Sequence, residues 1–325
     1  MVGTSCRVDN RRRSSKPTIM RLASSLMFAT VIATTAQPRI SAPVVGYVFD
    51  GNARTIRAVV GVPGAAAAGD QLSLDSSLSN AFLHPSQPIA VGIGKDGGVF
   101  ALSWRTIGRP QQTAIATQFG TPDRIVFASS ADRALLVSAA GVELWSGFGS
   151  GAPVSVYGYG TDALGGISRK AAVSPDGTLA AIVLDGDEII ELSSDGIRTI
   201  GPGRSAIYSP DLFILSADGT LRNSANTVAT GLDPESELWA VGGFNGAVTL
   251  SGQQIALVDS VTGRLTRVDC GGCKPAHAQA LATNGILYFE DAARGGFLLE
   301  IKSDAARIVP VTGIDARGND ARGNE

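Results

Sequence analysis

Short runs of apolar residues alternate with polar turn residues along much of this chain, and the pattern is clearest from Ala171 to Ile200. That segment reads AAVSPDGTLAAIVLDGDEIIELSSDGIRTI, in which the turn sequences SPDG, DGD and SDG separate the apolar runs. In such turns proline presets the backbone dihedral, aspartate bonds the backbone two residues on, and glycine adopts a positive φ. The pattern predicts four short antiparallel strands joined as a meander.

Related turns recur along the chain. When the sequence is aligned on Asp176, the comparable turn positions are Ser86, Asp132, Asp211, Asn245 and Asn284. The spacings between successive turns are 46, 44, 35, 34 and 39 residues. They lie around the ~40 to 45 residues of a four-stranded propeller blade. We expect the two shortest units to have trimmed loops or a weak outer strand.

The segment before the first of these turns resembles part of a blade. Val48 to Val59 reads VFDGNARTIRAV and is similar to Leu257 to Val268, LVDSVTGRLTRV. We interpret it as the outer hairpin of a blade whose inner strands come from elsewhere. The sequence thus predicts an all-β propeller over residues 40–312, with about seven four-stranded blades and a ring closed by N- and C-terminal strands, because closure removes exposed sheet edges. Six or eight blades, or a pair of β-sandwich domains, are the alternatives.

The SPDG turn, preceded by an alternating strand and followed by the apolar run LAAIVL, resembles the WD-repeat-like repeats of TolB-type bacterial β-propellers. The resemblance is best over residues 171–200, and it implies the fold, since propellers include scaffolds, ligand binders and enzymes. The WD dipeptide itself is absent, because Trp104, Trp145 and Trp239 are each followed by another residue.

Composition supports an all-β protein and argues against one class of partner. The chain of 325 residues contains 40 glycines, and 44% of its residues are hydrophobic but only 17% charged. The formal net charge is −2, and the basic residues beyond residue 40 form no stripe. Nucleic acid is therefore not an expected partner.

The N-terminus has the features of a secretory signal peptide over residues 1–36. Basic residues precede an uncharged run of 17 residues from Leu22 to Pro38, and small residues ending at Ala36 offer a cleavage site. Met20 could be the true start. A membrane anchor is the alternative, but the run is shorter than the ~20 apolar residues of a spanning helix. We expect a periplasmic or extracellular protein with no stable membrane span after cleavage, and a disordered polar tail over residues 313–325.

Two cysteines and two histidines are the next candidates for chemistry. Cys270 and Cys273 form the sequence CGGC, and in an exported protein we expect them to form a structural disulfide. A redox dithiol is one alternative, and a zinc site that includes His277 is another. His84 lies in a predicted turn, where we expect it to bond a neighbouring backbone group.

Four basic residues lie just before or at the start of predicted inner strands: Arg124, Arg169, Lys170 and Arg204. We predict that they lie at the rim of one face of the ring and contribute to a binding surface there. The alternative interpretation is that they only confer solubility.

No catalytic signature was found. The sequence GFGSG from Gly147 to Gly151 has its serine one position too late for a nucleophile elbow. No catalytic residue, metal ligand or cofactor is assigned. We predict an exported, non-enzymatic propeller that binds or scaffolds a protein, a peptide or a small ligand. The alternative is a metal-dependent lactonase or sugar-acid hydrolase with a calcium ion in the central channel.

Overall fold

The computed structural model describes residues 42–314, apart from residues 63, 76, 106–107, 224–225, 253, 283, 292 and 303–304. The expected signal peptide lies outside the described residues, as does the expected tail beyond residue 314. The described strands belong to one compact unit that begins at Ala42.

The described residues form seven antiparallel sheets, one after another along the chain, and each sheet is a blade of a β-propeller. Blade 1 consists of β1 (Val44–Asp50), β2 (Thr55–Val60) and β3 (Ala67–Gln71). Blade 2 consists of β4 (Leu78–Leu83), β5 (Ile89–Gly94), β6 (Val99–Ser103) and β7 (Gln111–Ile115). Blade 3 consists of β8 (Arg124–Phe127), β9 (Arg133–Ser138), β10 (Gly141–Ser146) and β11 (Val154–Gly160).

The other four blades follow the same order. Blade 4 consists of β12 (Ser168–Val173), β13 (Ala180–Leu184), β14 (Glu188–Ser193) and β15 (Gly196–Pro202). Blade 5 consists of β16 (Ser205–Ser209), β17 (Asp211–Leu215), β18 (Leu221–Arg222) and β19 (Thr227–Ala229). Blade 6 consists of β20 (Glu237–Trp239), β21 (Gly246–Ser251), β22 (Gln254–Asp259) and β23 (Leu265–Val268). Blade 7 consists of β24 (Pro275–Ala280), β25 (Ile286–Asp291), β26 (Gly295–Ile301) and β27 (Ala306–Pro310).

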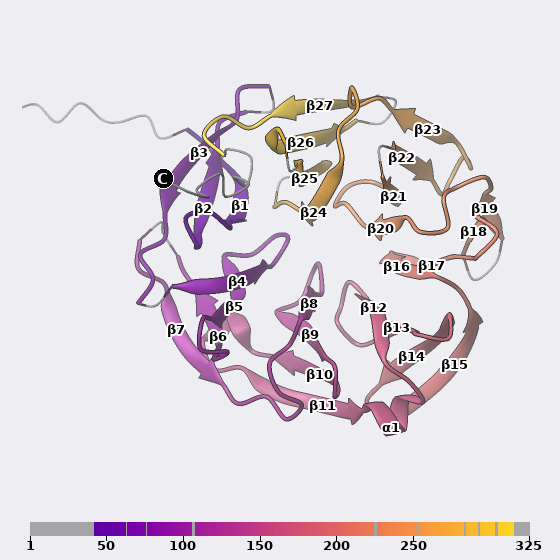
Figure 1. The fold of residues 1–325 in the computed structure, drawn as a ribbon, viewed down its shortest axis with the longest axis horizontal. Coiled ribbons are helices and arrows are strands. Elements are labelled where there is room, and N and C mark those ends of the chain that lie inside the picture. The colour runs from indigo at the N-terminus through magenta and orange to yellow at the C-terminus, as the bar shows by residue number, and fades with distance from the viewer. Residues whose placement is uncertain are drawn as a thin grey trace, which may run out of the picture. The chain divides into compact units, whose positions relative to one another are not determined.

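The blades follow one another around a ring, with the first strand of each blade nearest the centre (Figure 1). The first strands of successive blades contact one another from β1 through β4, β8, β12 and β16 to β20. Helical structure in the described residues is limited to a turn of 3-10 helix, Phe148–Ser150, and the four-residue α1 (Thr161–Leu164). The predicted all-β propeller with about seven blades is confirmed.

The ring closes where the two ends of the described chain meet. Thr312, which follows β27, forms a parallel bridge with Ala67 of β3. The N–H of Ala68 donates to the Thr312 carbonyl at 2.8 Å, and the N–H of Thr312 donates to the Ala66 carbonyl at 3.2 Å. Ile314 is only 7% exposed, so the packed chain extends beyond the boundary expected at residue 312.

One detail of the predicted closure is wrong. Val48 to Val59 spans parts of β1 and β2, which are the first two strands of blade 1 and not an outer hairpin. The sequence does not distinguish the two kinds of hairpin, because inner and outer hairpins of a blade are both tight antiparallel turns flanked by alternating strands. The blade is completed at its outer edge, where the C-terminal segment lies beside β3.

The six turns used in the sequence alignment all join the first and second strands of blades 2 to 7. The two short units are short for different reasons. Blade 4 has four full strands but tight turns between them, whereas blade 5 has outer strands of only two and three residues. Both predicted causes, trimmed loops and a weak outer strand, are therefore present, one in each unit.

The hydrophobic core lies between the blades, where neighbouring sheets pack face to face. One cluster joins blades 3 and 4 through fully buried residues such as Leu135 and Ile182. The second strands β5, β13 and β25 are buried at every position, which agrees with their nearly continuous apolar sequences.

The ring has two faces. We call one the turn face, since it carries the turns between first and second strands, such as Ser174–Leu179. We call the other the connection face, since it carries the connections between blades and the turns between second and third strands, such as Asp185–Asp187. A first strand runs from the connection face to the turn face.

Candidate functional site

The four basic residues singled out in the sequence lie at the starts of first strands, on the connection face. Arg124 begins β8, Arg169 and Lys170 lie near the start of β12, and Arg204 directly precedes β16. They are therefore neighbours across blades 3, 4 and 5.

These cations are engaged with acids and carbonyls of their own or adjacent blades. Asp187 forms ion pairs with two of them: its Oδ1 lies 3.2 Å from Nη1 of Arg169, and its Oδ2 lies 3.2 Å from Nε of Arg204. Arg204 also pairs with Glu235. Arg124 donates to the backbone carbonyl of Arg169.

Lys170 is half-buried. Its Nζ donates to the Ser236 carbonyl at 3.3 Å. Burial lowers the pKa of the Lys170 ammonium, while the nearby charges of Glu237 and Glu235 act in the opposite direction. The structure thus brings the predicted residues together as a network that links blades 3 to 6. A binding role for this cluster stays a prediction.

The CGGC segment follows β23 and connects blades 6 and 7. Cys270 and Cys273 are joined by a disulfide, with Cα atoms 5.4 Å apart. Arg294 holds the same loop by donating to the carbonyls of Cys270 and Gly271 at 3.4 and 2.7 Å. With each sulfur bonded to the other, neither is free to ligate zinc together with His277.

His84 occupies the turn between β4 and β5 and is only 5% exposed. Its Nδ1 accepts the N–H groups of Ser86 and Gln87, both at 3.0 Å. The proton therefore lies on Nε2, which donates to the Ala131 carbonyl of blade 3 at 3.1 Å. Burial lowers the pKa of this imidazole. The bonds to neighbouring backbone groups are those expected of a turn residue.

The SPDG turn of blade 4 is held by its own side chains. Ser174 Oγ donates to Asp176 Oδ1 at 2.6 Å, and the hydroxyl of Thr178 donates to the same carboxylate. These hydrogen bonds, with that of Ser174 first, lower the pKa of Asp176. Ser130 of blade 3 braces the turn by donating its hydroxyl to the Pro175 carbonyl at 2.6 Å.

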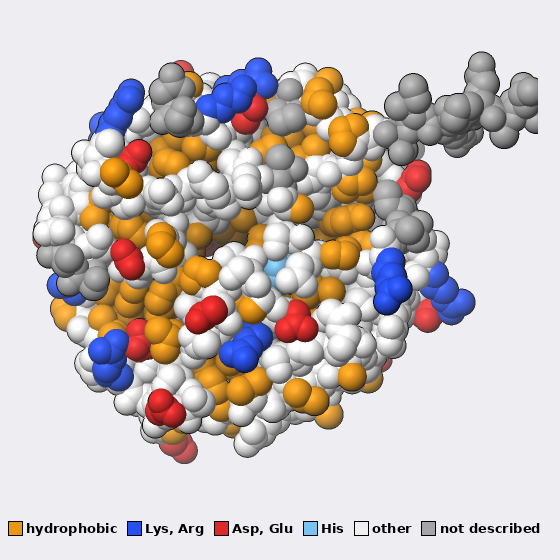
Figure 2. Space-filling view, turned by 180° about the vertical axis from the view of Figure 1, so that it is seen from behind, with side chains coloured by type: hydrophobic (Ala, Val, Ile, Leu, Met, Phe, Trp, Pro, Cys, Tyr) orange, Lys and Arg blue, Asp and Glu red, His pale blue; other side chains and the backbone are white. Residues whose placement is uncertain are grey.

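A groove of about 690 Å³ lies on the turn face, between blades 4 and 5. Its existence follows from the truncated β18 and β19, which leave the outer part of blade 4 uncovered on this side. In the view from behind Figure 1, hydrophobic side chains gather over this side of the ring, with acidic and basic side chains among them (Figure 2).

The two sheets contribute facing walls. Their apolar residues pack between the blades and form the floor of the groove: Leu179 and Ile200 from blade 4, with Leu212 and Ile214 from blade 5. The polar residues that line the groove include Asp176, Glu191, Arg198, Tyr208, Asp211 and Arg222.

A bonded row of polar groups crosses the groove. Glu191 and Arg198 are cross-strand partners on β14 and β15, and their side chains form an ion pair with Nη2 and Oε1 2.7 Å apart. Tyr208 from blade 5 donates its hydroxyl to Oε2 of Glu191 at 3.1 Å. Burial and the neighbouring Glu191 charge raise the pKa of Tyr208 above its usual value, so the phenol remains a donor and is not a base.

Arg222 ends the short strand β18 and lies directly opposite Ile214. Cross-strand partners project from the same sheet face, so Arg222 points towards blade 4 together with the apolar floor. Its Nη2 donates to the Pro202 carbonyl at 3.1 Å, and its buried Nε has no hydrogen-bond partner among the described residues.

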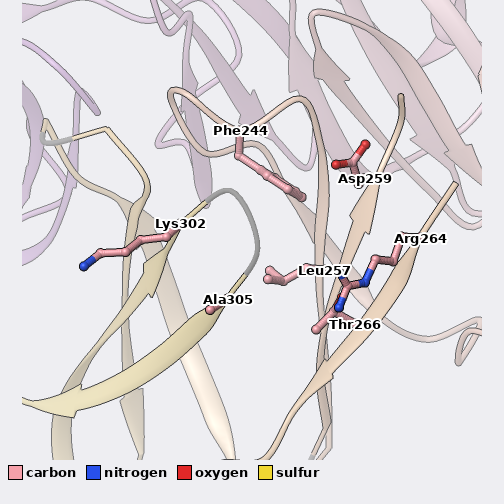
Figure 3. Close-up of a pocket in the computed structure, with 7 residues that line it drawn as sticks. All are labelled: Phe244, Leu257, Asp259, Arg264, Thr266, Lys302 and Ala305. Atoms are coloured by element: carbon pink, nitrogen blue, oxygen red, sulfur yellow. The ribbon is translucent and has the colours of Figure 1, made fainter. Parts of the chain in front are cut away.

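A second, much smaller pocket lies on the turn face between blades 6 and 7 (Figure 3). Phe244 and Leu257 point into it, whereas the Lys302 side chain extends away from it. Its volume is about 30 Å³, which is enough for roughly one water molecule. The groove between blades 4 and 5 is therefore the better candidate site.

Within the described residues, no three side chains among His, Cys, Asp and Glu gather closely enough to hold a metal ion. The segment from Asp185 to Glu188 contains three carboxylates and lies at a tight turn, in which Asp187 is paired with arginines. No helix in the described part of the chain is long and apolar enough to span a membrane.

The sequence could have led to the groove but did not. Glu191 and Arg198 lie in the same Ala171–Ile200 segment as the repeat, and the weak outer strands were expected from the spacing. The sequence does not reveal the strand register that places Arg222 opposite Ile214, nor the packing of Tyr208 against the neighbouring blade.

Comparison with known proteins gives the fold and no family. No protein family and no curated protein matches the sequence. Among solved structures, the chain is similar to the WD40 β-propeller domain of Doa1, with a TM-score of 0.50 and 13% sequence identity. The match covers 77% of this chain and 86% of that domain. At this identity the likeness shows fold alone: the chain has a WD40-like β-propeller fold with seven blades in its described part.

Proposed function

We propose that this chain is an exported, non-enzymatic β-propeller that binds a segment of another protein in the groove between blades 4 and 5. The observation that carries the proposal is the groove itself, an open space of about 690 Å³ with an apolar floor and a bonded polar row across it. Binding sites of this kind combine apolar area with a few placed polar groups. Export is supported by the signal-like sequence of residues 1–36.

Peptide selection tests the groove directly. Random twelve-residue peptides displayed on phage are selected on immobilised protein beginning at Gln37, and the enriched peptides are then tested on the variant Leu212→Arg. The arginine would fill the floor of the groove, so we expect enriched peptides to lose binding to this variant. Val261→Arg is the control, because Val261 is 77% exposed in a turn of blade 6.

Two results would contradict this use of the groove. One is the failure of any peptide to be enriched above a surface without protein. The other is equal binding of the enriched peptides to wild type and Leu212→Arg. Thermal unfolding of both variants establishes that they are folded before the comparison is made.

The proposed location is tested separately. Expression of the full chain in a bacterial host should give a processed protein in the periplasm or medium, with a new N-terminus near Gln37 on sequencing. Retention of the unprocessed chain in the cytoplasm would contradict export, whatever the outcome of peptide selection.

A further inference from the structure

Arg222 carries a positive charge that forms no ion pair with an acid in the described part of the chain. Ion pairs among the described residues involve seven other basic residues, and Arg222 is in none of them. Its one hydrogen bond given by the structure is to the Pro202 carbonyl. Arg198, the other arginine of the groove, differs because it is paired with Glu191.

The surroundings of Arg222 make this lack of a partner costly. The residue is half-buried, its Nε is fully enclosed with no hydrogen-bond partner among the described residues, and Ile214 lies directly beside it on the sheet. A charged group is destabilised when it leaves water unless an opposite charge or hydrogen bonds compensate for the loss. A ligand that brings a carboxylate to this guanidinium would supply that compensation.

The geometry of the guanidinium group and of β-sheets further restricts the chemistry and shape of the ligand. Guanidinium binds carboxylate through two parallel N–H···O bonds, which gives direction as well as affinity. The apolar floor of Ile200, Leu212 and Ile214 adjoins Arg222, so a side chain next to the carboxylate would lie on apolar atoms. In an extended chain, side chains on the same face recur every ~7 Å, which suits a groove between two sheet faces.

We propose that the groove binds an extended acidic peptide, with one carboxylate on Arg222 and a nearby aliphatic side chain on the floor of Ile200, Leu212 and Ile214. This inference rests on the proposed function and specifies the chemistry of its partner. The ion pair of Glu191 with Arg198, held by Tyr208, positions the opposite wall and is not the anchor.

The peptides enriched on the wild-type protein provide the probes. We expect most of them to share an Asp or Glu near a Leu, Ile or Val. Binding of one such peptide, and of its copy with Asn or Gln in place of the acid, is measured by fluorescence anisotropy on wild type, Arg222→Gln and Arg222→Lys. Arg267→Gln is the matched control, since Arg267 is an exposed arginine on β23 of blade 6.

The expected result is a loss of roughly tenfold or more in affinity for Arg222→Gln, partly restored in Arg222→Lys, with no change for Arg267→Gln. Neutralising the acid of the peptide should cause a similar loss, and the two changes together should cost little more than either alone. That non-additivity would locate the carboxylate on Arg222.

The inference and the proposed function fail in different ways. Peptides that depend on Leu212 but contain no acid, or that bind Arg222→Gln as tightly as wild type, would overturn the acidic-peptide inference and leave the groove as a binding site. The absence of any enriched peptide that depends on Leu212 would overturn both.

Discussion

The His84 ring joins the turn of blade 2 to blade 3 through Nε2, and through Nδ1 it holds its own turn only while neutral. Its Nδ1 accepts two backbone N–H groups, so a proton added there would break both bonds. The pKa of His84 is lowered in the folded state from its ordinary value of 6.5. As the pH falls below 6.5, the unfolded chain therefore binds a proton at His84 more readily than the folded protein does. The contribution of His84 to stability is therefore complete above pH 6.5 and declines as the pH falls from there towards the lowered folded-state pKa.

Urea unfolding at a series of pH values between 7.5 and 5 measures this effect. We expect His84→Asn to be less stable than wild type at pH 7.5 and to lose less of its remaining stability on acidification. His277→Asn is the control, because that residue is exposed and has a positive φ of 46° that asparagine tolerates. An identical pH dependence in wild type and His84→Asn would contradict the assignment.

Two tyrosines give opposite predictions for the loss of a hydroxyl. Tyr208 donates to Glu191, so Tyr208→Phe leaves that carboxylate with one hydrogen bond fewer and should destabilise the protein by roughly 1 to 3 kcal/mol. The Tyr157 hydroxyl is buried without a hydrogen-bond partner among the described residues, and burial raises its pKa to about 12. Tyr157→Phe should therefore be neutral or stabilising. Chemical denaturation of the two variants distinguishes these outcomes, and equal destabilisation would contradict them.

At the scale of a single element, the SPDG turn of blade 4 depends on the absence of a side chain at Gly177. Its φ is +71°, and a Cβ there would lie 2.6 Å from Cδ of Arg133 in blade 3. Gly177→Ala should therefore cost roughly 2 kcal/mol or more, because backbone strain and the displacement of Arg133 add.

Substitutions at two further glycines distinguish the effect of backbone strain from that of the steric clash. Gly165 has a φ of +79° but open space around its Cβ position, so Gly165→Ala should cost only the backbone strain, about 1 kcal/mol. Gly186 has neither a positive φ nor a close neighbour, and Gly186→Ala should change stability by less than about 0.5 kcal/mol. Urea midpoints provide the comparison, and equal effects at Gly177 and Gly165 would show that Arg133 yields without cost.

The same element shows what the sequence could and could not predict. Turn residues act locally, so Ser174, Asp176 and Gly177 indicate a strand boundary whatever surrounds them. The repetition of this turn along the chain therefore predicted the blades. The groove depends on which side chains of one sheet lie opposite those of the next. Arg222 belongs to a strand of two residues, too short to show any alternation, and nothing in its sequence neighbourhood indicates that it lies beside Ile214.

For the whole molecule, the ring distributes its contacts so that each blade is held by its two neighbours. Side chains from one turn bond the backbone of the next blade, as Ser86 does with the Ser129 carbonyl and Ser130 with the Pro175 carbonyl. Blade 5 is the exception in its outer half, where the short β18 and β19 leave the groove. The groove thus lies where the outer strands of a blade are shortest among blades 4 and 5.

Closure of the ring depends on the few residues that follow β27. Val311 and Ile314 are 4% and 7% exposed in the cluster shared by blades 1 and 7, and Thr312 bonds β3. Burying an aliphatic side chain contributes about 1.5 to 3 kcal/mol. We therefore expect a chain that ends at Pro310 to be less stable than one that ends at Ile314 by roughly 3 kcal/mol or more. The loss should appear first in blade 1, as faster hydrogen exchange at the Ala68 amide, whose acceptor is the Thr312 carbonyl. Equal stability and equal exchange in the two truncated chains would mean that the ring is closed by the blade 1 and blade 7 faces alone, without the C-terminal segment.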